Sequence, residues 1–83
     1  MRLKVTVKYF GSVKGDTGTD IEFLTLDEGF TVTQTISLLK EKHEGLRNRK
    51  GQILFALNQS YSSGDARIND GDELALFPVV SGG

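Results

Sequence analysis

Residues 31–45 read TVTQTISLLKEKHEG, and here the spacing between apolar residues changes from two to three or four. Val32, Ile36 and Leu39 stand at intervals of four and three, which places them on one face of a helix. The stretch therefore predicts an amphipathic helix over residues 32–44, with strand patterns before and after it.

Both ends of this helix carry terminal signals. Thr31 and Gln34 have the spacing of a capping box, in which each side chain accepts a hydrogen bond from a free backbone amide. Gly45 stands where a left-handed C-terminal cap is expected. Lys40 and Lys42 suit the negative end of the helix dipole.

The chain before the helix has two runs in which apolar and polar residues alternate, as in half-buried strands. The apolar positions are Leu3, Val5, Val7 and Tyr9 in the first run, and Ile21, Phe23 and residues 24–26 in the second. Between them lie residues 11–20, GSVKGDTGTD, whose three glycines predict a loop. We expect the two runs to form a hairpin.

The chain after the helix reads as a polar, basic loop followed by strands. Residues 53–58, ILFALN, predict a strand, a short extended piece is expected around Tyr61, and residues 73–79, ELALFPV, predict the last strand. Pro78 cannot donate a ladder hydrogen bond, so that strand should end there or lie at an edge. The element order predicts an α+β domain with one main helix on one face of a mixed sheet of about five strands.

Composition excludes several classes of protein. The chain has 83 residues, enough for one domain, and its net charge of −1 gives no reason to expect a nucleic-acid binder. No stretch predicts a membrane span, and the alternating N-terminus lacks the pattern of a signal peptide. The chain has no cysteine, which excludes disulfides and thiolate catalysis. We expect a cytoplasmic protein.

A search for catalytic or metal-binding motifs finds none. His43 is the only histidine and is interpreted as a half-exposed residue at the helix end, so no metal site is predicted. The glycines of residues 11–18 precede no predicted helix and are not interpreted as a phosphate cradle. The basic residues of 40–50 and the acidic residues of 65–73 are interpreted as solvated surface, or alternatively as contacts for an oppositely charged partner.

Three aromatic residues fall on the polar sides of the predicted strands. If Val5 and Val7 face the core, Phe10 does not, and Phe77 likewise alternates with buried positions of the last strand. Tyr61 is expected to join them. An apolar patch of this kind indicates a protein interface, the alternative being a second small core sealed by loops.

The chain ends FPVVSGG, residues 77–83, and this ending suggests a chemical role. Two glycines without a Cβ form a thin extended segment that can enter a narrow cleft, and they leave the carboxylate of Gly83 unhindered. A carboxylate becomes reactive only as an anhydride or a thioester. The two interpretations are an acyl-carrying end and a passive one.

Three stretches carry a resemblance that covers nearly the whole chain: YFG at 9–11, FALNQS at 55–60 and INDGDELALFPVVSGG at 68–83. They resemble the small subunit of molybdopterin synthase, a family of ubiquitin-like sulfur carriers. Family members often have two prolines where this chain has Pro78-Val79. The resemblance implies a ubiquitin-like β-grasp domain over residues 1–78, with the last strand beside the first, and a flexible Gly-Gly tail over residues 79–83.

The resemblance also implies a cycle. An activating enzyme similar to ubiquitin E1 enzymes uses ATP to adenylate Gly83, and a sulfur-donor system then leaves a thiocarboxylate. The carrier, itself a non-catalytic small subunit that binds no cofactor or metal, inserts its tail into the large synthase subunit within a heterotetramer. Two sulfurs convert cyclic pyranopterin monophosphate into molybdopterin. Gly82 gives clearance, and the implied partner-binding residues are Phe10, Tyr61, Phe77, Pro78, Val79, Val80 and Ser81.

Three other functions remain open at this point. The carrier chemistry also suits thiamine synthesis or tRNA thiolation. A ubiquitin-like modifier would instead be joined to target lysines through an isopeptide bond. The third alternative is a binding module with a passive tail.

Overall fold

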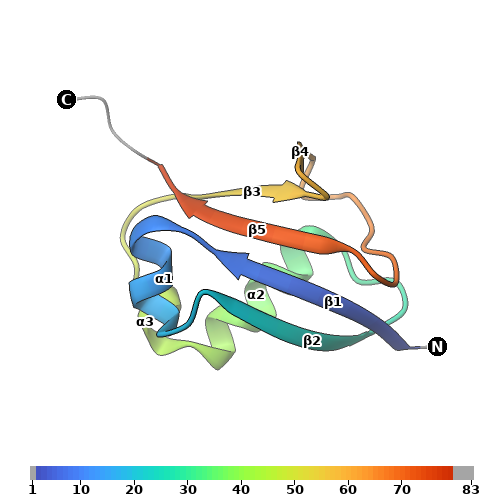
Figure 1. Ribbon diagram of the computed structural model, residues 1–83, viewed down its shortest axis with the longest axis horizontal. Helices are drawn as coiled ribbons and strands as arrows, with labels where there is room; N and C mark the ends of the chain where they lie inside the picture. Colours follow the sequence, from blue (N-terminus) through green and yellow to red (C-terminus); the bar gives the residue numbers. More distant parts are fainter. Residues whose placement is uncertain (1, 80–83) are drawn as a thin grey trace.

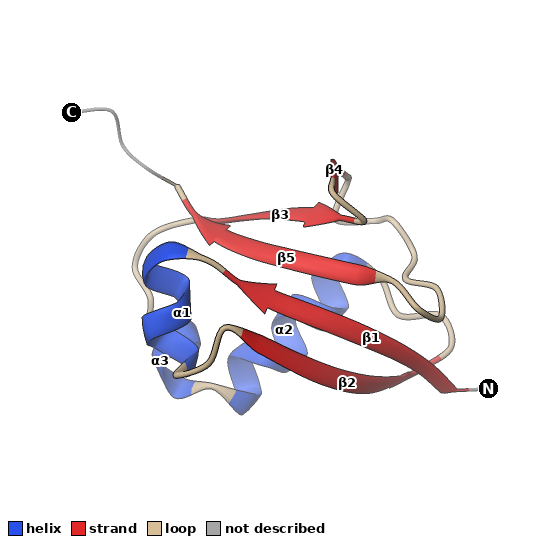
Figure 2. Cartoon of the chain, in the orientation of Figure 1, coloured by secondary structure: helices blue, strands red, loops and turns tan. Residues whose placement is uncertain are grey.

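The computed structural model of the chain describes residues 2–79, which form one sheet with helices on one face (Figures 1 and 2). Its elements are β1 Arg2–Tyr9, α1 Gly11–Thr17, β2 Ile21–Asp27, α2 Val32–Lys42, α3 Glu44–Arg47, β3 Ile53–Leu57, β4 Ser60–Tyr61 and β5 Glu73–Pro78. The predicted α+β arrangement of a five-stranded sheet and one main helix is confirmed.

The sheet has the strand order β2-β1-β5-β3-β4, so the first and last strands are neighbours at its centre. β1 and β5 run parallel, with Tyr9 beside Leu76, whereas the β1–β2 and β3–β5 pairs are antiparallel. α2 crosses behind the sheet in Figure 1. This is the β-grasp topology that the resemblance implied, and the predicted hairpin is its first unit.

The start of α2 is as predicted and its end is not. Thr31 accepts a hydrogen bond from the backbone of Gln34, whose side chain accepts one from the backbone of Thr31, so the capping box is present. The helix ends at His43 in an extended conformation rather than at a left-handed Gly45. The chain turns at once into α3, in which Gly45 is needed because a Cβ there would lie 2.4 Å from the carbonyl oxygen of Asp16.

The loop predicted over residues 11–20 is wrong, because residues Gly11–Thr17 form α1. A single apolar residue in this segment, Val13, is fully buried, so the sequence shows no helical period there. Gly18 ends the helix in the left-handed conformation, with φ 76°, and its N–H donates to the carbonyl of Lys14. Packing in the folded domain, rather than local propensity, therefore stabilises this short helix.

The core lies between the sheet and the helices. Its buried apolar residues are Leu3, Val5, Val7, Tyr9, Val13, Leu24, Leu26, Val32, Leu39, Leu46, Ile68, Leu74 and Leu76. The predicted inward faces of β1, α2 and β5 are confirmed, with Ile36 partly buried at the margin. In β2 only Leu24 and Leu26 face the core, because Ile21 and Phe23 alternate with them and lie on the opposite face.

β5 ends at Pro78, as its missing N–H predicted, although the strand is central rather than at an edge. The N–H of Val79 donates a long hydrogen bond, 3.4 Å, to the carbonyl of Gln52. Residues 80–83 and Met1 lie outside the described residues, so the predicted boundary between domain and tail stays a prediction. Within residues 2–79, no helix has the length and apolar character needed to cross a membrane.

Candidate functional site

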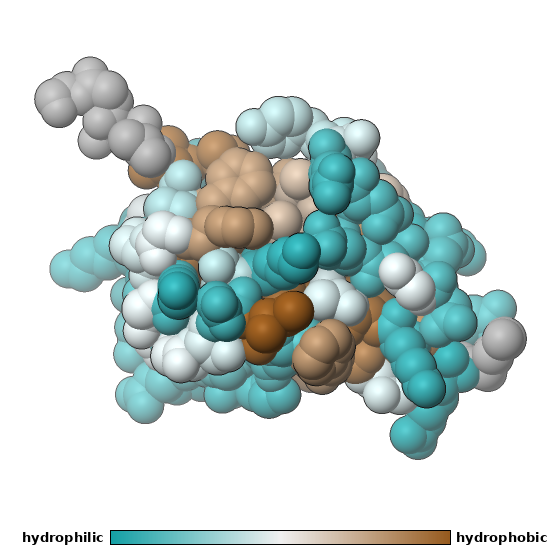
Figure 3. All heavy atoms as spheres, in the orientation of Figure 1, coloured by the Kyte–Doolittle hydropathy of each residue, from teal (hydrophilic) through white to brown (hydrophobic). Residues whose placement is uncertain are grey.

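The sheet face without helices carries an exposed apolar surface near the end of β5. Its members are Phe10, Leu54, Tyr61 and Phe77, which we call the aromatic patch. Phe10, Leu54 and Tyr61 are 49%, 39% and 80% exposed, and Phe77 is half-buried. Figure 3 shows hydrophobic surface gathered over β3 and β5 on this face.

Strand register brings the members of the patch together. The N–H of extended Phe10 donates to the carbonyl of Leu76 at 3.0 Å, which continues β1 alongside β5 and places Phe10 on the same face as Phe77. Leu54 pairs with Phe77 across the β3–β5 ladder. The rings of Tyr61 and Phe77 meet edge to face, with centroids 6.2 Å apart. The predicted grouping of Phe10, Tyr61 and Phe77 on one uncovered face is thus what the structure has.

Two further apolar residues on this face were not singled out from the sequence. Phe23 is 74% exposed and Ile21 is 39% exposed, both on the edge strand β2. An ion pair between Lys8 and Glu73, 3.0 Å long, lies on the strands between them and the aromatic patch. The available signal was that β2 is apolar at both alternating positions, although only one face of the sheet is covered.

The last described residues lie beside the aromatic patch. Pro78 is half-buried and Val79 is 45% exposed, so the chain continues from the end of β5 next to Phe77. The other residues predicted to act in the tail, Val80, Ser81, Gly82 and Gly83, lie outside the described residues. The patch and the start of the tail are therefore adjacent on the molecule.

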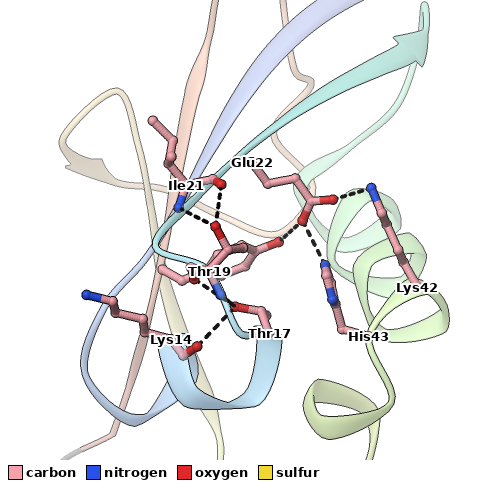
Figure 4. Close-up of polar contacts among 8 residues, drawn as sticks. Lys14, Thr17, Thr19, Ile21, Glu22, Lys42 and His43 are labelled. Carbon is pink, nitrogen blue, oxygen red and sulfur yellow. Dashed lines mark hydrogen bonds and ion pairs between the residues drawn. The ribbon is translucent and has the colours of Figure 1, made fainter.

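A polar cluster on the helix side joins β1, β2 and the end of α2 (Figure 4). One oxygen of Glu22 accepts a hydrogen bond from the Tyr9 hydroxyl at 2.7 Å and contacts Nε2 of His43 at 2.7 Å. The other oxygen forms an ion pair with Lys42. His43 is only 17% exposed and its ring meets that of Tyr9, so the half-exposed position expected for it is wrong.

The cluster changes the acidity of two of its members. Burial alone would raise the pKa of Glu22, but hydrogen bonds from Lys42, Tyr9 and His43, together with the charge of Lys42, lower it to about 2. Burial raises the pKa of the Tyr9 hydroxyl, and its hydrogen bond to the Glu22 carboxylate raises it further. Glu22 is therefore an ionised link between β2 and α2.

We expect this link to make the free energy of unfolding depend on pH in acid. Because folding lowers the pKa of Glu22 from 4.5 to about 2, its contribution is present above pH 4.5 and is lost as the pH falls toward 2. The loss should be about 2 to 3 kcal/mol, at about 1.4 kcal/mol for each pKa unit. Urea unfolding at pH 6 and pH 2.5 measures it. Glu22→Gln should be less stable at pH 6 and should lose less stability on acidification; equal pH dependence in both proteins would contradict this role.

The two charge clusters serve partly in the fold. Arg49 pairs with Asp16 and donates to the Ser12 hydroxyl at 2.6 Å, which holds the segment after α3 against α1. In the acidic cluster, Asp72 is buried and accepts hydrogen bonds from Asn58 and from the backbone of Asn69. These members are structural, so neither of the two predicted alternatives, solvated surface or docking site, describes them.

Comparison with known proteins identifies the family. The family model described as "ThiS family" matches residues 7–83, which is most of the chain. The chain belongs to the ThiS family. Among curated members it is similar to the molybdopterin synthase sulfur carrier subunit of Mycobacterium tuberculosis, 33% identical with 98% of this chain and 99% of that protein covered. The human protein of the same name is 32% identical, with 96% and 94% covered.

Solved structures of ThiS-type and related carriers share the fold. A putative molybdopterin converting factor subunit 1 from Pyrococcus furiosus has a TM-score of 0.85 and 34% identity, covering 94% of this chain and 99% of that one. SAMP1 from Haloferax volcanii has a TM-score of 0.85 and 27% identity, covering 96% and 99%. A complex of subunits 1 and 2 of the Helicobacter pylori molybdopterin-converting factor matches with a TM-score of 0.69 and 27% identity, covering 98% and 100%. The chain is thus a ThiS-family β-grasp protein, with relatives named as molybdopterin synthase sulfur carriers.

Proposed function

We propose that this ThiS-family protein is the sulfur carrier subunit of a molybdopterin synthase. The observation that carries the proposal is full-length similarity to curated carrier subunits in a chain whose final residues are Gly82 and Gly83. The aromatic patch at the end of β5 supports it, because an exposed apolar surface next to the tail suits a protein partner that receives the tail.

The proposed chemistry takes place at the carboxylate of Gly83. The carboxylate attacks the α-phosphorus of ATP on an activating enzyme, which forms an acyl adenylate and releases pyrophosphate. A donor of sulfur at the oxidation level of sulfide then attacks the acyl carbon and displaces AMP, leaving a thiocarboxylate. The thiocarboxylate sulfur is transferred to the pterin precursor on the large synthase subunit, and two transfers complete the dithiolene of molybdopterin.

The carrier contributes presentation rather than catalysis in this scheme. Gly82 and Gly83 add no side chain beside the reacting carbonyl, and residues 78–81 lead it away from the domain. The aromatic patch docks on the partner. The Helicobacter pylori structure, a complex of subunits 1 and 2, supports a large subunit as that partner.

The docking role predicts a selective effect of Phe77→Ala. Removing this ring from the middle of the patch should weaken binding to the large synthase subunit of the same organism by about 10- to 100-fold, as for a central interface aromatic. Titration calorimetry measures the affinity, and urea unfolding measures stability.

Phe23→Ala is the matched control, because Phe23 is an exposed phenylalanine on the same face but beyond the Lys8–Glu73 ion pair. Its affinity should stay within about threefold of the wild type. Equal losses of affinity in the two variants, or a Phe77→Ala protein that loses stability but not affinity, would contradict the docking role.

A second function is favoured by one comparison. SAMP1 is a small archaeal modifier protein, and its structure matches this chain at 27% identity. Conjugation would join the activated Gly83 carbonyl to a lysine amine with loss of AMP. Mass spectrometry of cell extracts for lysines that carry a C-terminal fragment of this chain distinguishes the two: such adducts indicate a modifier, and thiocarboxylate without adducts indicates a carrier.

A further inference from the structure

The turn between β3 and β4 has an uncommon backbone. Both of its central residues, Asn58 and Gln59, have positive φ, at 52° and 67°. Two-residue hairpin loops with positive φ at both positions match the twist of the strands, and Asn is the residue other than Gly that best tolerates this conformation. The turn geometry alone therefore explains an Asn at 58, but not what its side chain does.

The Asn58 side chain fastens this turn to the start of β5. Its Nδ2 donates to Oδ1 of Asp72 at 2.9 Å, and its Oδ1 accepts from the N–H of Glu73 at 2.9 Å. The backbone N–H of Asn58 donates to the carbonyl of Glu73 at 2.8 Å. Both ends of the carboxamide are thus used, each toward a neighbouring residue of the same strand.

Asp72 is itself held in place. It is only 9% exposed, and its second carboxylate oxygen accepts a hydrogen bond from the N–H of Asn69 at 2.7 Å. Asn58 therefore binds a carboxylate that is already fixed within the turn before β5. A hydrogen bond to a buried, fixed partner contributes more than an exposed one.

The segment that this contact orients carries Tyr61. β4 has only two residues, paired as Leu57 with Ser60 and Ala56 with Tyr61. Tyr61 is 80% exposed, and its ring contact within residues 2–79 is the edge-to-face one with Phe77. So short a strand depends on its turn for its direction.

We propose that Asn58 is a positioning residue for the docking surface: by fastening the β3–β4 turn to Asp72 and Glu73, it holds Tyr61 against Phe77 in the orientation that the partner meets. The inference rests on the proposed function for the identity of that partner. It assigns Asn58 an effect on affinity that is exerted through Tyr61 and without contact with the partner.

A reciprocal exchange tests the contact. Asn58→Asp places a carboxylate against that of Asp72, and Asp72→Asn leaves one acceptor for two donors, the side chain of Asn58 and the N–H of Asn69. The double variant restores each pair, because the new amide at 72 donates to the new carboxylate at 58 and still accepts from Asn69. Asp tolerates the left-handed backbone as Asn does, and the net charge of the double variant is that of the wild type.

The first measurement needs no partner. The chain has two tyrosines and no tryptophan, and Tyr9 is buried, so the ring signals of Tyr61 are readily assigned by NMR. The nuclear Overhauser contact between the rings of Tyr61 and Phe77 should be lost or weakened in Asn58→Asp and restored in the double variant. Asn58→Gly, which keeps the left-handed turn and adds no charge, should also weaken it.

The second measurement is affinity for the large synthase subunit. Asn58→Asp should weaken binding about 5- to 10-fold, and the double variant should bind within about twofold of the wild type. In a Tyr61→Ala background, Asn58→Asp should weaken binding by less than about twofold, because the ring that it positions is absent. A role in stability alone would give no such non-additivity.

The outcomes separate this inference from the proposed function. An unchanged Tyr61–Phe77 contact in both Asn58 variants, or an equal loss of affinity with and without Tyr61, overturns the positioning role. If the wild-type chain does not bind the large subunit at all, the proposed function fails, whereas the NMR comparison still decides whether Asn58 positions Tyr61.

Discussion

Removal of Gly82 and Gly83 is expected to lower molybdopterin formation at least about 100-fold, because a reacting carbonyl displaced by two residues can no longer reach its partner's active site. The melting temperature should be almost unchanged, since the buried core residues of the described chain run from Leu3 to Leu76. Reconstitution with the large subunit, the activating enzyme, ATP and a sulfide source measures the activity, and calorimetry measures the melting temperature.

Replacing both glycines by alanine is the matched control for this deletion. It keeps the length of the tail and its carboxylate and adds only two methyl groups, so it tests whether the partner cleft needs residues without a Cβ. We expect activity between that of the deletion and the wild type. Full activity of the deletion variant would show that the final carboxylate is not the reacting group.

The largest effect on stability is expected from Gly45→Ala. A Cβ at this position would lie 2.4 Å from the carbonyl oxygen of Asp16 and 3.1 Å from its carbonyl carbon, so α3 and α1 would have to move apart. The obstructing atoms belong to the backbone, and the pairing of Arg49 with Asp16 resists the movement. We expect a loss of about 2 to 3 kcal/mol in the free energy of unfolding, measured by urea denaturation.

Gly15→Ala provides the comparison within α1. A Cβ at Gly15 meets no atom within 4 Å, and alanine favours a helix over glycine by about 1 kcal/mol, so this variant should be as stable as the wild type or more so. If Gly45→Ala were as stable as Gly15→Ala, the close approach of α1 and α3 would be wrong.

The fold was predictable where local pattern and burial agree. The period of Val32, Ile36 and Leu39 and the capping box at Thr31 gave the start of α2 correctly, and the alternation in β1 and β5 gave their inward faces. α1 was missed because its helix depends on burying one residue, Val13, against the rest of the domain. No pattern within seven residues can show a contact that forms only in the folded chain.

The candidate site shows the same division. Alternation placed Phe10 and Phe77 on the uncovered face, and the strand register confirms it. The link between Glu22 and His43 joins residues 21 positions apart, and the one between Asn58 and Asp72 joins residues 14 apart. Such pairs depend on how strands and helix meet, which residue spacing does not reveal.

The central claim is that the working group of this protein is the carboxylate of Gly83. The most direct test is the intact mass of the chain after incubation with the activating enzyme, ATP and a sulfide source. The account predicts a mass increase equal to the replacement of one oxygen by sulfur, located by fragmentation at Gly83 and absent when ATP is omitted. An unchanged mass under conditions in which a known carrier subunit is converted, or a sulfur located at any other residue, would contradict it.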